Sequence, residues 1–239
     1  METERLYARL QTCGIPITLE SCSLICRYHA LLIHWNNQMD LTNVTDAQEA
    51  LNRHYADSLL PLTRGELFPQ GASLIDVGTG AGFPGLPLAM ARPDLNVTLL
   101  DAQQKRVSFL QAVIDELHLS NVRAIHARAE DGARLPHLRE SFDLAVARAV
   151  ACAPVLLEYL LPFVKIGGRA LMWKGPSVRD ELAQANAAAQ KLGGQLEEPL
   201  PMALPNLEWN HLLLPCRKAE KTLRQYPRKA GIPTKKPLG

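Results

Sequence analysis

Several features of secreted and membrane proteins are missing from this 239-residue chain. No apolar run approaches the roughly 20 residues that a membrane-spanning helix needs. The opening residues, Met1-Glu2-Thr3-Glu4-Arg5, contain neither the charged nor the apolar region of a signal peptide. The five cysteines are odd in number and form no Cys-x-x-Cys pair. We therefore expect a cytoplasmic protein.

A metal site is not indicated either. Cys22, Cys26 and His29 could share one face of a helix and hold a metal ion. A buried apolar face in a reducing compartment explains the same spacing, because a free cysteine packs as a small hydrophobic residue. We favour this second interpretation and expect no metal.

Aromatic residues are scarce in the most strongly charged part of the chain. Residues 217–239 contain eight basic residues and one acid, Glu220, so this tail carries +7, the preceding 216 residues −5 and the whole chain +2. A basic tail on an acidic body suits contact with a polyanion, and a solvated, disordered terminus is the alternative. Tyr226 is the only aromatic residue in the tail, so base stacking has little support and the charge alone identifies no partner.

The hydrophobic pattern divides the chain into a helical N-terminal segment, residues 1–70, an α/β domain, residues 71–216, and the basic tail. In the first segment apolar residues recur at helical spacing, and Asp46 and Glu49 have the spacing of a capping box. In the second, strands predicted at 73–77, 96–100, 122–126, 143–147, 169–173, 196–200 and 211–215 alternate with helices predicted at 84–91, 103–118, 153–162 and 177–192. Gly167-Gly168 and Gly193-Gly194 fall at predicted turns. This alternation predicts a mostly parallel seven-stranded sheet with helices on both faces.

The run from Leu74 to Gly85, Leu-Ile-Asp-Val-Gly-Thr-Gly-Ala-Gly-Phe-Pro-Gly, predicts a strand, a glycine loop and a helix. Gly78, Gly80 and Gly82 allow positive φ and let a ligand approach the backbone closely. The next predicted strand ends in Asp101, about twenty residues beyond the glycines, where a carboxylate can accept the ribose hydroxyl protons of a bound nucleoside. The run therefore predicts a nucleotide-type binding site.

Two cofactors compete for this geometry. Gly80 to Gly85 match the Gly-x-Gly-x-x-Gly pattern of a dinucleotide site, whose pyrophosphate binds at a helix N-terminus. Counted from the end of the strand, however, Phe83 stands where the third glycine belongs. The pattern Asp-x-Gly-x-Gly-x-Gly, from Asp76 to Gly82, fits S-adenosylmethionine better, because that ligand has no phosphate and carries a sulfonium and an amino group. A methyl donor is favoured, and a dinucleotide-dependent oxidoreductase is the alternative.

Polar residues after the later strands extend the predicted site, since ligands of open α/β sheets bind beyond the carboxyl ends of the strands. After the third strand, a backbone amide near Ala129 and the side chain of Glu130 could contact an adenine edge. Arg148 follows the fourth strand and Lys174 the fifth, at the rim where an acceptor would bind.

The segment after the fourth strand also lacks two features of base-modifying enzymes. It has no Asn/Asp-Pro-Pro-aromatic loop, which methyltransferases of exocyclic amines share, and Cys152 has no partner cysteine for covalent attack on a pyrimidine. An acceptor atom that is already nucleophilic, such as guanine N7, is therefore expected. Its methylation requires orientation against the sulfonium methyl and no general base.

The ordered motifs resemble the bacterial 16S ribosomal RNA guanine-N7 methyltransferases, the RsmG (formerly GidB) family. They are Trp35-Asn36, Asp40-Leu41-Thr42, Arg53-His54, Asp57-Ser58-Leu59, the loop from Asp76 to Gly85, Leu100-Asp101, Lys105-Arg106, Phe109-Leu110, Arg128-Ala129-Glu130, Ala147-Arg148-Ala149, Lys174-Gly175 and the tail segment from Tyr226 to Pro233. The resemblance implies a Rossmann-like class I methyltransferase fold and S-adenosylmethionine-dependent methylation of one guanine, nucleotide 527, in 16S ribosomal RNA of the small subunit.

The resemblance also implies site residues. Gly78, Phe83, Ala129, Glu130 and Arg148 are expected to contact the donor, joined by Gly80 and Asp101 on physical grounds. Arg53 and Lys174 are tentative contacts to RNA phosphates, and His54 is expected mainly in the core.

We further expect a monomer, and we expect that deletion of residues 217–239 weakens RNA binding while donor affinity stays nearly unchanged. A non-catalytic ribosome-binding assembly factor with the same fold is a further alternative.

Overall fold

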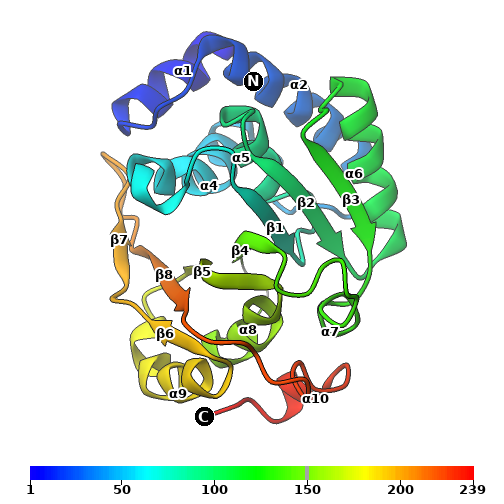
Figure 1. Ribbon diagram of the computed structural model, residues 1–239. Helices are drawn as coiled ribbons and strands as arrows, with labels where there is room; N and C mark the ends of the chain where they lie inside the picture. Colours follow the sequence, from blue (N-terminus) through cyan, green and yellow to red (C-terminus); the bar gives the residue numbers. More distant parts are fainter. Residues whose placement is uncertain (149–150) are drawn as a thin grey trace.

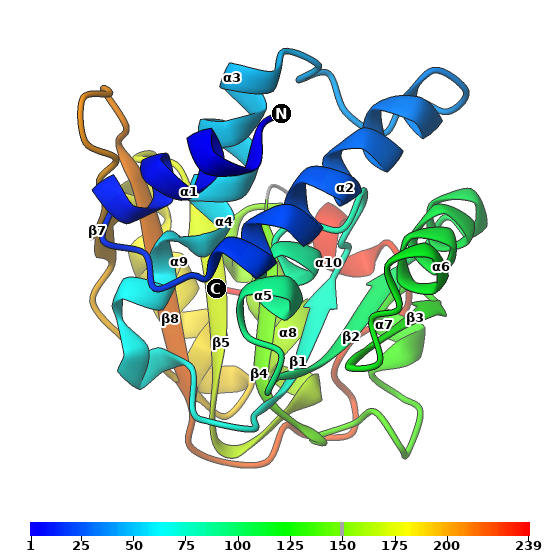
Figure 2. The same cartoon turned by 90° about the horizontal axis from the view of Figure 1, so that it is seen from above.

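One mixed sheet with helices on both faces organises the computed structural model, which describes residues 1–148 and 151–239 (Figures 1 and 2). Ala149 of the Ala147-Arg148-Ala149 motif lies outside the described residues. The strands are β1 Ser73–Val77, β2 Asn96–Asp101, β3 Val122–His126, β4 Phe142–Arg148, β5 Val164–Lys174, β6 Gly194–Leu196, β7 Leu200–Met202 and β8 His211–Lys218. Their order is β3-β2-β1-β4-β5-β8-β6, and β7 also pairs with β8. The first five strands in this order are parallel and β8 runs antiparallel to β5, so the predicted mostly parallel α/β sheet is confirmed.

The helices follow the predicted pattern closely. They are α1 Thr3–Thr12, α2 Leu19–Asn36, α3 Ala47–Ala50, α4 Asp57–Leu59, α5 Gly85–Ala91, α6 Gln104–Leu117, α7 Ala129–Gly132, α8 Ala153–Leu160, α9 Val178–Lys191 and α10 Ile232–Lys235. A π-helical segment, Leu51–Ala56, joins α3 to α4. Asp46 caps α3, because its Oδ1 accepts a hydrogen bond from the Glu49 N–H at 2.8 Å. Among the residues described, no helix is both long and apolar enough to cross a membrane.

Successive residues of each strand face opposite sides of the sheet and enter two hydrophobic cores. In β1, Leu74 packs with the N-terminal helices, α5 and α6, whereas Ile75 packs with α8 and α9. Leu6 and Leu32, from α1 and α2, are fully buried in the first of these cores. The N-terminal helices therefore cover the same face of the sheet as α5 and α6 (Figure 2).

Two expectations about the later strands are wrong. The strand predicted at 196–200 is instead β6 and β7, which pair with different parts of β8. Pro199 lies between them and has no N–H to donate to a neighbouring strand. Gly167-Gly168 lie within β5 rather than in a turn, at a register shift in the pairing of β4 with β5. Gly167 has φ +89°, and a Cβ on Gly168 would collide with the Asp143 carbonyl oxygen, which explains both glycines.

The C-terminal tail packs against the body of the protein. Lys218 and Thr222 are buried, and Leu238 near the C-terminus joins the core formed with α8 and α9. Between them the chain passes α8 and forms α10 (Figure 1). This docking differs from the solvated, disordered terminus that composition alone allows.

Candidate active site

The carboxyl ends of β1, β2, β3, β4 and β5 meet at one edge of the sheet, where the order changes direction between β1 and β4. The glycine loop leaves β1 at this edge, and Gly78, Gly80 and Gly82 have φ values of 72°, 60° and 107°. These angles favour glycine and confirm the predicted conformation. The helix begins at Gly85, directly after Pro84.

Asp76, the acid that precedes the loop, is completely buried beneath it. Its Oδ2 accepts hydrogen bonds from the Thr79 hydroxyl at 2.7 Å and the Gly85 N–H at 2.8 Å, whereas Oδ1 has no partner among the residues described. Burial raises the pKa of this carboxyl to about 7, against the opposing effect of those hydrogen bonds. Asp76 therefore holds the loop against the helix.

The raised pKa of Asp76 predicts a specific pH dependence of stability. The folded protein binds this proton more tightly than the unfolded chain, so the carboxyl lowers the free energy of unfolding as pH rises from about 4 to about 7. Asp76→Asn removes this effect, and its free energy of unfolding should rise relative to the wild type by on the order of 3 kcal/mol over that interval. Urea denaturation at pH 5 and pH 8 measures the change.

Asp143→Asn is the matched control, because hydrogen bonds from Ser73 and contact with Lys165 outweigh burial and lower the pKa of Asp143. The stabilisation from a lowered carboxyl pKa is lost only below about pH 4, so between pH 5 and pH 8 this variant should keep the pH profile of the wild type. Parallel pH profiles for the wild type and Asp76→Asn would contradict the role of Asp76.

Asp101, at the end of β2, holds the loop from the neighbouring strand. Its Oδ2 accepts a hydrogen bond from the Gly80 N–H at 2.9 Å, and Oδ1 accepts one from the Gln103 N–H at 2.8 Å. The guanidinium of Arg106 lies 3.6 Å from Oδ2. A carboxylate can accept about four hydrogen bonds, so lone pairs remain for a ligand. The ribose contact of Asp101 stays a prediction.

A cavity of about 280 Å³ opens beside the loop. It brings together Gly78, Ala129 and Glu130, three of the predicted donor contacts. Most of its surface is apolar, and Glu130 is only 5% exposed. Such a cavity fits the adenosine half of S-adenosylmethionine, whose flat ring needs apolar walls and whose amino group needs an acceptor.

Two tail residues, Gly231 and Thr234, also line this cavity. The Gly231 N–H donates a hydrogen bond of 2.9 Å to Oε1 of Glu130. The tail therefore forms part of the predicted donor site, whereas the sequence predicts that the two are separate.

Arg148, at the end of β4, is fixed by the N-terminal helices. One guanidinium nitrogen, Nη1, donates to Oδ2 of Asp57 at 3.0 Å and to the backbone carbonyl of Arg53 at 2.9 Å. The same guanidinium lies 4.9 Å from the centroid of the Phe83 ring. Phe83 is itself buried, with its ring stacked on His54 at 4.4 Å between centroids. The Phe83 ring therefore supports Arg148, and contact of Phe83 with the donor stays a prediction.

Sequence reasoning missed the cluster around Asp57. This carboxylate is 2% exposed, and its Oδ1 accepts hydrogen bonds from Trp209 Nε1 at 3.2 Å and His211 Nδ1 at 2.9 Å. Trp173 Nε1 donates to the Asp57 backbone carbonyl at 2.9 Å. Burial alone would raise the pKa of Asp57, but the hydrogen bond from His211 and the charge of Arg148 hold it below its ordinary value. His211 is the first residue of a predicted strand, and this position is the one local signal in the sequence that could have pointed to the cluster.

A second cavity, of about 230 Å³, lies between this cluster and the end of β5. Its lining residues are Asp57, Arg148, Ala151, Trp173, Lys174, Gly175, Ser177 and His211. We call this the acceptor-side cavity. Arg148 borders it and also contacts Phe83 of the glycine loop. The carboxyl edge of the sheet therefore carries one cavity with cationic and aromatic side chains and one cavity that is mostly apolar.

The tentative RNA contacts occupy different environments. Arg53 is exposed and pairs with Glu49 at 3.1 Å across one helical turn. Lys174 is 10% exposed and donates to the Ala151 carbonyl and pairs with Glu181, both at 3.1 Å. His54 is half-buried, and its Nδ1 has no hydrogen-bond partner in the described part of the chain. Burial, followed by the charge of Arg148, lowers the pKa of His54 to about 4. Contact of Arg53 or Lys174 with RNA stays a prediction.

Of the three metal candidates on α2, Cys22 and His29 lie in the core and Cys26 is half-buried at its edge. Cys22 is fully buried, and burial raises the pKa of its thiol to about 12. The His29 ring nitrogen Nδ1 lies 3.1 Å from the Tyr55 hydroxyl. These residues stabilise the packing of the N-terminal helices on the sheet.

The fold and the site together define an S-adenosylmethionine-dependent methyltransferase of class I. Solved structures agree on the fold. The crystal structure of M. jannaschii TYW2 in complex with AdoMet is 18% identical, with coverage of 68% of this chain and 76% of that chain and a TM-score of 0.51. The complex of the Haloferax volcanii Trm112 methyltransferase activator with a methyltransferase contains a chain that is 14% identical, with coverage of 74% and 94% and a TM-score of 0.54.

The family follows from closer relatives. The family model described as rRNA small subunit methyltransferase G matches residues 21–203. A ribosomal RNA small subunit methyltransferase G of Clostridium botulinum is 45% identical over 228 residues, which are 95% of each chain. One of Leuconostoc mesenteroides is 44% identical over 239 residues, the full length of both. The chain belongs to the rRNA small subunit methyltransferase G family.

Proposed function

We propose that this protein transfers a methyl group from S-adenosylmethionine to N7 of one guanine, nucleotide 527, in the 16S ribosomal RNA of the small subunit. The observation that carries the proposal is the 44–45% identity, over nearly the whole chain, to proteins named as ribosomal RNA small subunit methyltransferases. The choice of N7 rests on the missing amine-methyltransferase loop and on the chemistry of the site.

The donor would bind across the glycine loop, with its adenosine in the cavity lined by Gly78, Ala129 and Glu130, which we call the adenosine cavity. Asp101 would hold the loop and accept a ribose hydroxyl. When bound, the donor supplies a sulfonium methyl, which the N7 lone pair attacks as the carbon–sulfur bond breaks and its electron pair moves to sulfur. Arg148 and the backbone of Phe83 would define the end of the site where this methyl lies.

The groups around Arg148 suit an acceptor that needs no deprotonation. The Asp57 oxygens are engaged by Arg148, Trp209 and His211, and the low pKa of His54 makes it a weak base at neutral pH. Guanine N7 carries no proton, so the protein needs only to orient the base and exclude water. The acceptor-side cavity lies beside Arg148 and offers the place for it.

The dinucleotide alternative fits this structure poorly. A pyrophosphate would bind at the N-terminus of α5, yet the Gly85 N–H there already donates to the buried Asp76 carboxylate. A pyrophosphate would therefore have to compete with Asp76 for this N–H.

The experiment that tests the proposal is methyl transfer from labelled S-adenosylmethionine to small subunits prepared from a strain without this protein. Mapping at single-base level should find one N7-methylguanine, at nucleotide 527 of the 16S RNA. A labelled exocyclic amine or pyrimidine would overturn the choice of N7. Binding of subunits and donor without any transfer would favour the non-catalytic assembly factor instead.

His211 offers a test of the acceptor side. His211→Ala removes a hydrogen bond to Asp57 and one wall of the acceptor-side cavity, while the adenosine cavity is unchanged. We expect about a tenfold loss of kcat/KM for subunits, of the size of one lost hydrogen bond to a charged group, with unchanged affinity for S-adenosylhomocysteine. His137→Ala, at an exposed position, is the control. Equal losses for donor and acceptor would show that the two cavities are not separate.

A further inference from the structure

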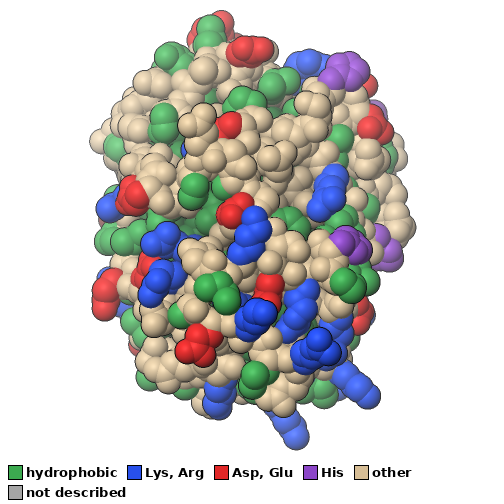
Figure 3. All heavy atoms as spheres, in the orientation of Figure 1, with side chains coloured by type: hydrophobic (Ala, Val, Ile, Leu, Met, Phe, Trp, Pro, Cys, Tyr) green, Lys and Arg blue, Asp and Glu red, His purple; other side chains and the backbone are tan. Residues whose placement is uncertain are grey.

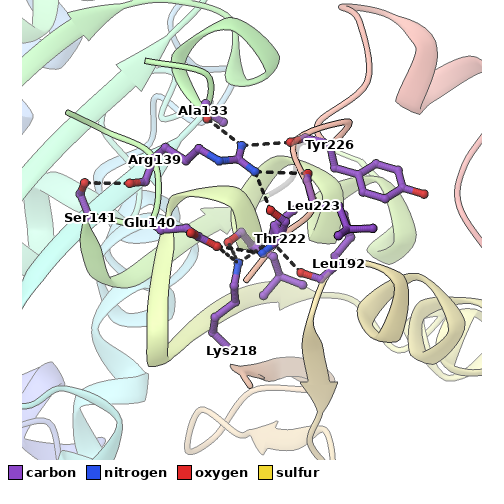
Figure 4. A network of polar contacts seen from close by, with 10 residues as sticks. Ala133, Arg139, Glu140, Ser141, Leu192, Lys218, Thr222, Leu223 and Tyr226 are labelled. Atoms are coloured by element: carbon purple, nitrogen blue, oxygen red, sulfur yellow. Dashed lines mark hydrogen bonds and ion pairs between the residues drawn. The ribbon is translucent and has the colours of Figure 1, made fainter. Parts of the chain in front are cut away.

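The C-terminal tail is attached to the body through buried polar groups. Lys218 is 0% exposed, and its ammonium donates to the Leu161 carbonyl at 2.6 Å and to the Thr222 hydroxyl, and pairs with Glu140 at 3.3 Å. Burial lowers the pKa of Lys218 to about 8, even though Glu140 opposes this effect. A buried cation with all these partners fixes the start of the tail (Figure 4).

Arg139 holds the next part of the tail. Its guanidinium donates to the carbonyls of Thr222 at 2.8 Å, Leu223 at 3.3 Å and Tyr226 at 3.0 Å, and also to that of Ala133 at 3.2 Å. Figure 4 shows the guanidinium lying between the loop that carries Ala133 and the tail. One side chain from the segment before β4 therefore anchors residues 222–226.

A buried ion pair holds the segment that follows. Glu158, on α8, is 0% exposed and accepts from the backbone N–H of Arg228 at 2.7 Å and from its guanidinium at 2.6 and 2.9 Å. Charge-assisted, two-point pairing of this kind fixes geometry as well as adding energy. Residue 228 is thereby held against α8.

Three residues later the chain reaches the adenosine cavity. Gly231 has φ +79°, and its N–H donates to Glu130 Oε1 at 2.9 Å. Tyr159 lies in the same cavity, and burial and then the negative charge of Glu130 raise the pKa of its phenol. Glu130 is thus held from the side of the tail, with its carboxylate at the cavity.

We propose that residues 228–234, the wall segment, form one side of the donor pocket and that Gly231 positions Glu130 toward the adenine of the donor. The inference rests on the proposed function, because it takes S-adenosylmethionine as the ligand. It assigns Arg228 and Gly231 as positioning residues that act through Glu158 and Glu130. Donor binding and docking of the wall segment then strengthen one another by the same factor.

This coupling has a consequence for RNA. Basic side chains gather on the lower half of the face in Figure 3, the region where α10 and the tail lie in Figure 1. Lys229, Lys235 and Lys236 are exposed, and they lie within or directly after the wall segment. A polyanion bound to these lysines would contact the same segment that closes the donor pocket.

The first test compares the full chain with one that ends at Pro227, which keeps the anchors at Lys218 and Arg139. Titration calorimetry with S-adenosylhomocysteine, without RNA, should show at least tenfold weaker binding by the shortened chain. Methylthioadenosine, which lacks the amino-acid half, should show the same loss because the wall segment lies at the adenosine end. Arg228→Ala should weaken binding of S-adenosylhomocysteine several-fold. Arg169→Ala, which breaks the pair with Glu197, should leave the affinity unchanged.

The second test uses the unaltered protein and does not depend on folding of a variant. Saturating S-adenosylhomocysteine should slow tryptic cleavage after Arg228 and Lys229 by at least tenfold, since cleavage requires the wall segment to leave the pocket. Unchanged ligand affinity of a folded shortened chain, or cleavage that is insensitive to the ligand, would overturn the proposal. Absence of ligand binding by the unaltered protein would overturn the proposed function as well, which distinguishes the two failures.

Discussion

Arg148→Ala should lower methyl transfer by at least 100-fold. The substitution leaves the Asp57 carboxylate, 2% exposed, without its cationic partner, and breaking such a buried pair costs on the order of 3–5 kcal/mol. It also removes the contact over the Phe83 ring and the hydrogen bond to the Arg53 carbonyl. Because these contacts join the glycine loop to the acceptor-side cavity, both should lose their shape together.

Single-turnover methyl transfer to small subunits, with thermal unfolding measured in parallel, checks this prediction. Arg148→Lys keeps the charge but not the planar guanidinium, so it should recover only part of the activity. Arg169→Ala is the control for loss of an arginine that is paired elsewhere in the sheet. Near-normal transfer by a folded Arg148→Ala variant would falsify the role of Arg148 as the link between the two cavities.

Asp101→Ala should weaken binding of S-adenosylhomocysteine by about 100-fold. The carboxylate accepts from the N–H groups of Gly80 and Gln103, and alanine leaves both donors without a partner at the centre of the donor site. Each lost hydrogen bond to a charged group costs roughly 1.5–3 kcal/mol. The glycine loop would then lose its fixed position as well as a ribose acceptor.

Calorimetric titration of the variant measures this loss. Asp94→Ala is a closely matched control, because Asp94 also accepts a backbone N–H, that of Gly71, and contacts an arginine, Arg92. Asp94 lies before β2, at the opposite end of that strand from Asp101. We expect Asp94→Ala to lower stability with no change in ligand affinity, and equal affinities for the two variants would contradict a local role of Asp101.

Much of the fold could be predicted because its signals are local. The glycine loop needs positive φ at Gly78, Gly80 and Gly82, and few other residues tolerate it. The parallel strands are short apolar runs separated by amphipathic helices, so their positions are recovered to within a few residues, except that β5 begins five residues earlier than predicted. Gly78, Ala129 and Glu130 fall into one cavity because the ends of neighbouring parallel strands share one edge.

The rest depends on contacts between distant parts of the chain. Asp57, Trp209 and His211 are separated by more than 150 residues at their extremes and meet only because β8 pairs antiparallel with β5. The docking of the tail could not be predicted either, because Arg228 pairs with the buried Glu158, which lies seventy residues away in the sequence. Composition predicts that such a tail is charged, but not which of its charges is already neutralised inside the protein.

The tryptophan side chains provide an intrinsic fluorescence signal for this site. Of the three tryptophans in the chain, Trp173 and Trp209 both donate to Asp57, while Trp35 packs against Phe109 in the N-terminal core. Fluorescence emission from the first two responds to the polarity around Asp57, and that from Trp35 supplies a constant background. Entry of the proposed guanine acceptor into the acceptor-side cavity should therefore be measurable in real time without a label on either the protein or the RNA.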